Sequence, residues 1–231
     1  MSRGPIKTSS LIPVLLVAAA IALWIFDAYK KGGFERFEVG HGRQASGSSP
    51  SAKTPTRTGR YDTYTGCTLA EDRTNDGDSF RVKLPGGRTE IIRLYFADCP
   101  ESAFKTYTSG ENNHDRIDKQ AADMGRITPQ QAVEIGKKAK EFTLHHLDRD
   151  PFTLHTEWHS PFNDNRYQGF IELNENGKNR FLHELLVEKG YARIHTKGAP
   201  LPDGTSERKQ EDHLYDLQRS AKSAKPRAWA Y

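Results

Sequence analysis

Two acidic turns on either side of a hairpin constrain this chain more than any other feature. The stretch from Asn75 to Glu101 contains two arms of alternating residues joined by Pro85-Gly86-Gly87, a pattern typical of paired antiparallel strands. Asp76-Gly77-Asp78 comes before the first arm, and Asp98-Cys99-Pro100-Glu101 follows the second. The pattern therefore predicts a hairpin with carboxylates gathered at one end.

The second arm carries an arginine among apolar residues. Alternation places Ile92, Leu94 and Phe96 on one face and Arg93 and Tyr95 on the other. Crowded carboxylates repel one another unless a cation lies between them, and oxygen ligands beside a glycine turn suit a hard cation, Ca²⁺ before Mg²⁺. Either acidic turn alone is typical of an ordinary structural turn. The two turns together, beside an arginine, favour a functional site.

The chain after the hairpin contains signals for helices and strands. Thr128 as N-cap and Gln131 form a capping box, and Pro129 stands at the first helical position; together they predict the start of a helix. Further elements are predicted as strands at Phe152–Trp158 and Arg166–Leu173 and as helices at Phe181–Lys189 and Glu207–Ser223. The polar stretch from Ser102 to Arg126 is predicted to be irregular, with His114 in an exposed loop. This order predicts an α+β fold, a five-stranded OB-type barrel with about three helices.

The acidic turns and the arginine together resemble the thermonuclease (staphylococcal nuclease) family. Its pattern is Asp-Gly-Asp-Thr followed by Arg-Leu-x-x-x-Asp-Thr-Pro-Glu, and the likeness covers about Tyr61 to Tyr231. The resemblance implies that Asp78, Asp98 and the carbonyl of Cys99 hold Ca²⁺. It also implies that Glu101 orients or deprotonates the attacking water, and that Arg93 and a second arginine grip the phosphate.

The chain departs from this family pattern at several positions. Aligning the strand after residue 165 on its glycine and apolar residues makes Arg166 the second arginine, whereas aligning on Asp164 would place Gln168 there. We favour Arg166 because its register keeps the apolar residues in place. Thr196 and Gly198 stand where the family has tyrosines that stack on a nucleotide. The chemistry is therefore expected to be intact and nucleotide recognition altered.

The N-terminal part has a different composition. Leu11 to Phe26 is an uncharged apolar run flanked by basic residues, and it ends in large side chains. These features favour an uncleaved membrane anchor at residues 1–31 over a cleaved signal peptide. Residues 32–60 are predicted to be a flexible linker, and residues 61–231 a thermonuclease-like domain. The domain is expected on the exported side of the membrane, or secreted if the segment is cleaved.

Net charge and cysteine content limit the classes of partner and of stabilising cross-link that this chain can have. The net charge of +4 and the pI near 9.0 are compatible with a polyanionic partner. The two cysteines, Cys67 and Cys99, give neither a disulfide framework nor a zinc site, and Cys67 is expected to be a small core residue.

The expected function is that of a Ca²⁺-dependent nuclease. The resemblance implies that it cleaves DNA and RNA with little sugar specificity and leaves 3′-phosphate ends. The alternative is a non-catalytic nucleic-acid-binding OB-fold module tethered to the membrane. No protein partner is evident from the sequence, and a monomer is expected.

Overall fold

The computed structural model describes residues 55–125, 127–161 and 163–224. The predicted membrane anchor at residues 1–31 and most of the predicted linker lie outside this part of the chain. Within the three described ranges, no helix is both long and apolar enough to cross a membrane.

Five strands close into a barrel. Each strand pairs with the next in the order β2-β3-β4-β7-β6, and β6 pairs back onto β2. The pair formed by β4 and β7 is parallel and the other four are antiparallel. The predicted α+β barrel is therefore confirmed. Its strands are β2 (Tyr61–Leu69), β3 (Ser79–Lys83), β4 (Thr89–Leu94), β6 (Phe152–Thr156) and β7 (Arg166–Glu175).

The predicted hairpin is formed by β3 and β4. Ser79 pairs with Arg93 at the end nearest the acidic turns, and the core-facing residues Ile92 and Leu94 are fully buried. The alternation predicted beyond Leu94 is wrong, because Tyr95 is buried as well. The strand ends at Leu94, and Phe96 has a left-handed backbone with φ of 64°. Since this conformation breaks the alternation of a strand, both rings enter the core against Phe170.

Short strands extend the barrel at its edges. β1 (Thr56–Thr58) pairs with β2, so regular structure begins inside the predicted linker. β8 (Lys178–Phe181) continues β7 as a second hairpin. β5 (Ala97–Asp98) pairs with β9 (Arg193–Ile194), and this small sheet brings the second acidic turn next to a distant part of the chain.

The described residues contain four helices instead of about three. The capping box predicted at Thr128 is present at the start of α3 (Pro129–Arg149), and α4 (Leu182–Glu188) and α5 (Glu207–Ala224) follow the predicted ranges closely. The prediction of an irregular segment up to Arg126 is wrong, because α2 (His114–Asp123) lies within it. Ile117 and Ala121 are buried on one face of α2, which stabilises this otherwise polar helix.

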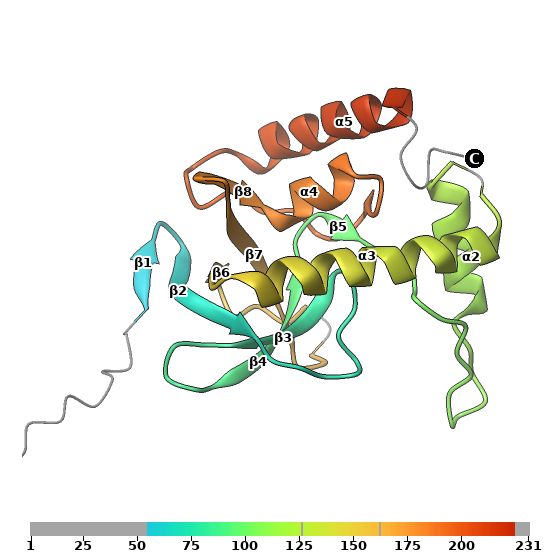
Figure 1. Ribbon diagram of the computed structural model, residues 1–231, viewed down its shortest axis with the longest axis horizontal. Coiled ribbons are helices and arrows are strands. Elements are labelled where there is room, and N and C mark those ends of the chain that lie inside the picture. Colours follow the sequence, from blue (N-terminus) through green and yellow to red (C-terminus); the bar gives the residue numbers. More distant parts are fainter. Residues whose placement is uncertain (1–54, 126, 162, 225–231) are drawn as a thin grey trace, which may run out of the picture. The chain divides into compact units, whose positions relative to one another are not determined.

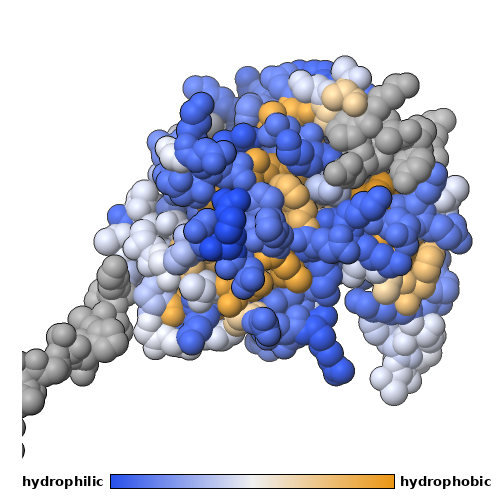
Figure 2. Space-filling model, in the orientation of Figure 1, coloured by the Kyte–Doolittle hydropathy of each residue, from blue (hydrophilic) through white to orange (hydrophobic). Residues whose placement is uncertain are grey.

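The helices pack around the barrel as two pairs. α2 packs on α3, which contacts β2, and α5 packs on α4, which contacts β7. Figure 1 shows α3 running across the strands with α2 beside it, and α5 above α4. Figure 2 shows that polar and charged residues cover most of this face, with apolar residues visible between them. Both cysteines are buried and unpaired, and Cys67 is a core residue as predicted.

Candidate active site

The two acidic turns meet at one arginine. Nη2 of Arg93 lies 3.3 Å from Oδ2 of Asp78 and 2.8 Å from Oδ1 of Asp98. The backbone N–H of Cys99 also donates to Oδ2 of Asp78, at 3.1 Å. Both aspartates are buried. The hairpin therefore brings together four of the residues that the sequence predicted for the site.

Helix α3 holds both turns in place. Oγ1 of Thr143 donates a 2.7 Å hydrogen bond to the carbonyl of Gly77, in the first turn. Gly136 lies against the second turn, where an added Cβ would come within 2.5 Å of the carbonyl oxygen of Glu101. A glycine is therefore required where the helix meets this backbone. Gly136 and Thr143 are two turns apart on the same helix, and their contacts fix the distance between the two acidic turns.

Gln120 of α2 fastens the second turn, and sequence analysis missed it. Its Nε2 donates to Oδ2 of Asp98 at 3.0 Å and to the carbonyl of Cys99 at 2.9 Å. Its Oε1 accepts from the backbone N–H of Glu101 at 3.0 Å. The spacing of Ile117, Ala121 and Met124 was a signal for a helix here. No local signal, however, indicated that Gln120 would face the second acidic turn.

Two further arginines surround Asp98, and neither was predicted. Nε of Arg193, in β9, lies 2.8 Å from Oδ2 of Asp98, and Nη1 of Arg193 also pairs with Asp123. Nη2 of Arg116, in α2, lies 3.2 Å from Oδ1 of Asp98. With Arg93, three guanidinium groups compensate one buried carboxylate.

Glu101 lies at the outer edge of this cluster. Its Oε1 is 3.3 Å from Nη1 of Arg116, and its Oε2 accepts from Nδ2 of Asn113, also at 3.3 Å. Nζ of Lys105 lies 3.8 Å from the same Oε2. The side chain of Glu101 is more exposed than that of Asp98, at 14% against 2%. Among Asp78, Asp98 and Glu101, solvent therefore reaches Glu101 most easily.

The two aspartates that share Arg93 have pKa values displaced in opposite directions. Burial raises the pKa of Asp78 to about 7, although the charge of Arg93 opposes this shift. Burial also acts to raise the pKa of Asp98, but the hydrogen bond from Gln120 and the three guanidinium groups outweigh it and hold that pKa below its usual value. Asp78 is therefore the less compensated of these two carboxylates, so an additional cation would stabilise its charge.

A cavity of about 730 Å³ opens beside the cluster. Arg93, Asp98 and Arg166 all line it, so the predicted second arginine lies in the same cavity as the first. The wall has a positive charge excess, with six cationic residues against the three aspartates Asp98, Asp115 and Asp164. The cationic residues are Arg93, Arg116, Lys119, Arg166, Arg193 and Lys197. Such a wall attracts anions.

Arg166 lines this cavity without contacting the acidic cluster. Its Nε donates a 2.8 Å hydrogen bond to Oδ2 of Asp164. In the parallel pairing of β4 and β7, Arg166 lies opposite Ile91, and Gln168 lies opposite Arg93. Gln168 also lines the cavity, and its Oε1 is buried without a hydrogen-bond partner among the described residues. The register therefore places Gln168, rather than Arg166, next to Arg93.

The two positions that lack the family's tyrosines have structural roles. Oγ1 of Thr196 donates a 3.0 Å hydrogen bond to the carbonyl of Leu94. A Cβ at Gly198 would lie 2.5 Å from Cε1 of Phe96. There is consequently no space for a tyrosine at residue 198 in this packing.

The donor set fits a hard divalent cation held by few protein ligands. Across residues 55–224, apart from the two undescribed positions, no group of three or more His, Cys, Asp or Glu side chains is arranged to hold a metal ion. Asp78 and Asp98 nevertheless converge on a single cationic nitrogen of Arg93. The carbonyl of Cys99 accepts one hydrogen bond and retains a second lone pair. Oxygen donors of this kind suit Ca²⁺ or Mg²⁺, with substrate and water completing the shell.

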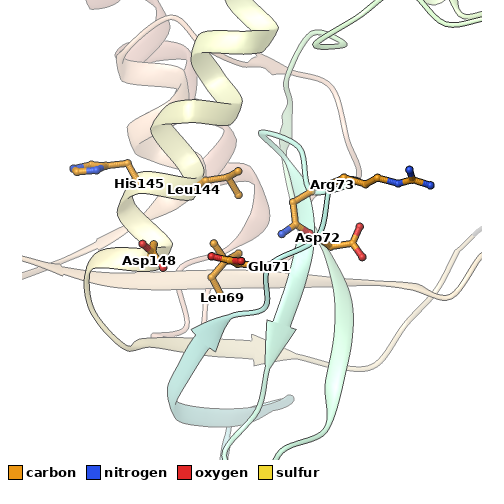
Figure 3. Close-up of a pocket in the computed structure, with 8 residues that line it drawn as sticks. Leu69, Glu71, Asp72, Arg73, Leu144, His145 and Asp148 are labelled. Atoms are coloured by element: carbon orange, nitrogen blue, oxygen red, sulfur yellow. The ribbon is translucent and has the colours of Figure 1, made fainter. Parts of the chain in front are cut away.

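A second cavity, of about 610 Å³, lies between the end of β2, residues 71–75 that follow it, and α3. Leu69, Glu71, Leu144 and Asp148 are among the residues that line it. Figure 3 shows His145 and Arg73 extending to opposite sides of the view. Glu71, Arg73, His145 and Asp148 are all exposed, and the half-buried Asp72 is paired with Arg81, so no uncompensated buried charge lines this cavity.

Comparison with known proteins identifies the family. A search of curated proteins gave no match. The family described as staphylococcal nuclease homologue matches residues 91–231, more than half of the chain, and this range includes Arg93, Asp98 and Glu101. The match begins after Asp78, which the hairpin brings to the same site. The chain therefore belongs to the staphylococcal nuclease family.

Proposed function

We propose that this protein is a Ca²⁺-dependent nuclease that hydrolyses phosphodiester bonds in DNA and RNA, with little sugar specificity and with 3′-phosphate products. One observation carries the proposal: Arg93 contacts two buried carboxylates and also lines a cavity whose wall has a positive charge excess. A site for a cation and a surface for an anion are therefore adjacent. This combination suits a phosphodiester, whose negative charge must be compensated before water can attack.

Asp78, Asp98 and the carbonyl of Cys99 are the proposed ligands of the metal ion. Bound Ca²⁺ would act as a Lewis acid toward a phosphate oxygen. The chain itself holds these ligands in position, because Arg93 and Gln120 both hydrogen-bond Asp98. Helix α3 fixes the turn that carries Asp78.

Glu101 and the arginines supply the remaining roles. Glu101 is proposed to orient the attacking water and accept its proton, since its carboxylate lies at the solvent-exposed edge of the cluster. Arg93 and Arg166 are proposed to bind phosphoryl oxygens with their fork-shaped donors, for which lysine is a poor substitute. Because these groups contact phosphate and not sugar, the site accepts both DNA and RNA.

The N-terminal segment is proposed to anchor the enzyme. Its apolar run, Leu11 to Phe26, supports tethering of the domain on the exported side of a membrane, and the basic pI is compatible with a nucleic-acid substrate there. Trypsin treatment of intact cells and of broken cells measures on which side the domain lies. Protection in intact cells that have a permeable outer layer would contradict this proposal.

The proposed activity can be tested with the full-length protein in detergent. Incubation with single-stranded DNA and RNA in Ca²⁺ should cleave both, and a chelator should abolish cleavage. Arg93→Lys should lower turnover by about 100-fold or more, because one preorganised transition-state donor is lost. Arg219→Lys is a matched control, since Arg219 pairs with Asp216 on the exposed face of α5 and neither residue lines the cavity.

The products and the chelator arm distinguish the alternatives. Cleavage fragments should carry 3′-phosphate ends, and fragments with 3′-hydroxyl ends would contradict that part of the proposal. A folded protein that binds DNA but cleaves neither substrate under any condition would instead be a non-catalytic binding module.

A further inference from the structure

Arg116 differs from the other two arginines at Asp98 in its exposure. The side chains of Arg93 and Arg193 are 11% and 8% exposed, whereas that of Arg116 is 42% exposed. Arg93 is shared between two aspartates, and Arg193 is likewise held by Asp98 and Asp123. Arg116 lines the cavity and approaches it from α2. It is therefore the guanidinium group of the cluster that an incoming ligand reaches most easily.

The contacts of Arg116 are long for charge-assisted hydrogen bonds. Its Nη1 lies 3.3 Å from Oε1 of Glu101, and its Nη2 lies 3.2 Å from Oδ1 of Asp98. Optimal contacts between a guanidinium and a carboxylate are about 2.7–2.9 Å. Each terminal nitrogen also has a second N–H. Arg116 can therefore donate a hydrogen bond to a further oxygen, or exchange a carboxylate oxygen for one, at small cost.

The position of Arg116 also places it closer to the chemistry than Arg166. Arg116 contacts both the proposed base, Glu101, and the proposed metal ligand Asp98. Arg166, by contrast, is hydrogen-bonded to Asp164 and lies opposite Ile91 in the strand pairing. The position opposite Arg93 is held by Gln168, which has no positive charge. A second cation next to Arg93 and Glu101 thus comes from α2 and not from β7.

We propose that Arg116 is a catalytic residue that binds the phosphate undergoing cleavage, together with Arg93. This inference rests on the proposed nuclease function and refines it. The guanidinium group of Arg116 exchanges its weak contacts with the two carboxylates for phosphoryl oxygens when substrate enters the cavity. Arg166, at the β7 side of the cavity, then contacts a neighbouring phosphate of the nucleic acid.

The test uses the full-length protein and compares Arg116→Gln and Arg116→Lys with Arg166→Gln and the control Arg219→Gln. Both Arg116 variants should lower kcat for DNA cleavage in Ca²⁺ by about 100-fold, because lysine lacks the fork that contacts two oxygens. Arg166→Gln should act mainly on KM. Added methylguanidinium should restore part of the activity of Arg116→Gln, a response that a purely structural role would not give.

A binding measurement separates failure of this inference from failure of the proposed function. The probe is a phosphorothioate-linked DNA oligonucleotide, titrated in Ca²⁺ and followed by fluorescence anisotropy. If wild type binds but does not cleave DNA, the proposed hydrolysis is wrong. In that case, weaker binding by Arg116→Gln than by wild type and the control variant still supports contact between Arg116 and phosphate. Activity of Arg116→Gln within about threefold of wild type would overturn the inference. No binding by wild type would overturn it as well, whereas equal binding with a 100-fold lower kcat would place the contact of Arg116 in the transition state.

If Arg116→Gln fails to fold, Arg116→Lys keeps the aliphatic stem that packs in the cluster and takes its place. Thermal unfolding of each variant measures this directly. A lysine variant that folds normally and cleaves like wild type would also count against a catalytic role for Arg116.

Discussion

The two cavities of this domain are similar in size but differ in how their charges are arranged. Asp98, in the larger one, is 2% exposed and contacts three guanidinium groups. In the smaller one, Glu71 and Asp148 are exposed to solvent. Water screens the charges of Glu71 and Asp148, so these charges have little effect on the free energy of folding, either unfavourable or favourable. A buried charge is stable only with counter-charges and hydrogen bonds, and removing one partner is therefore expensive.

This contrast has a functional consequence. Charges that are compensated inside the protein are fixed in position before a ligand arrives, and fixed charges stabilise a transition state without reorganisation. The exposed charges of the smaller cavity have no such constraint. We therefore place the proposed chemistry in the larger cavity, and the following predictions test that proposal in order of decreasing effect.

The largest effect is expected at Asp98. Asp98→Asn removes the carboxylate that three arginines share and leaves each of them with a single carboxylate partner, so the free energy of unfolding should fall by about 3–5 kcal/mol. Cleavage of DNA should be lost under conditions in which the variant is still folded. Urea unfolding followed by tryptophan fluorescence measures the first quantity. A decrease in the free energy of unfolding of less than about 1 kcal/mol would show that the three arginines do not depend on Asp98 for their compensation.

The next effect concerns the hydrogen bonds of Gln120 to the second acidic turn, which we call the Gln120 clamp. Gln120→Leu removes the hydrogen bonds to Asp98 and Cys99 and leaves the backbone N–H of Glu101 without its partner. The free energy of unfolding should fall by about 3 kcal/mol, because a charged acceptor and a buried donor are both affected. Gln130→Leu, at an exposed position, should have an effect below about 0.5 kcal/mol. Similar effects of both changes in denaturant melts would contradict the clamp.

A buried histidine tests the rule that a buried charge is unstable without a counter-charge, because no counter-charge contacts its ring. His183 packs among Phe96, Phe170 and Phe181, and burial lowers its pKa to about 3. The unfolded chain therefore takes up a proton that the folded protein does not. Stability is full above the unfolded pKa of about 6.5 and falls as the pH decreases toward the folded value.

Between pH 7 and pH 5 this single group should lower the free energy of unfolding by about 2 kcal/mol. His183→Leu should remove that part of the pH dependence, whatever its effect on stability at pH 7. Chemical unfolding of both proteins at several pH values gives the difference. Parallel pH profiles would show that His183 is protonated in the folded state.

The smallest effect is expected in the other cavity. Asp148→Asn changes an exposed charge that lines the smaller cavity, so unfolding should change by less than about 0.5 kcal/mol. DNA cleavage should stay within about twofold of wild type. A clear loss of activity in a standard cleavage assay would mean that the smaller cavity takes part in the chemistry, and the comparison would fail.

Much of the fold follows from signals that lie close together in the sequence. The alternation in the two arms and the Pro85-Gly86-Gly87 turn specify the hairpin, and the capping box at Thr128 specifies the start of α3. Such signals act over a few residues, where backbone sterics and local hydrogen bonds decide the conformation. The same short range explains the errors. Alternation could not foresee the left-handed Phe96, and the polar sequence of α2 conceals a helix that packing stabilises.

The sequence by itself determined the hairpin, the two acidic turns and the place of Arg93 between them, because all of these depend on residues close together in the chain. Only the tertiary structure decided what surrounds Asp98. Arg193 is 95 residues away in the chain, and Gln120 is 22. The parallel register of β4 and β7 likewise put Gln168 opposite Arg93. Contacts of this kind arise when separate elements pack together, and no local pattern encodes which polar side chains will then meet.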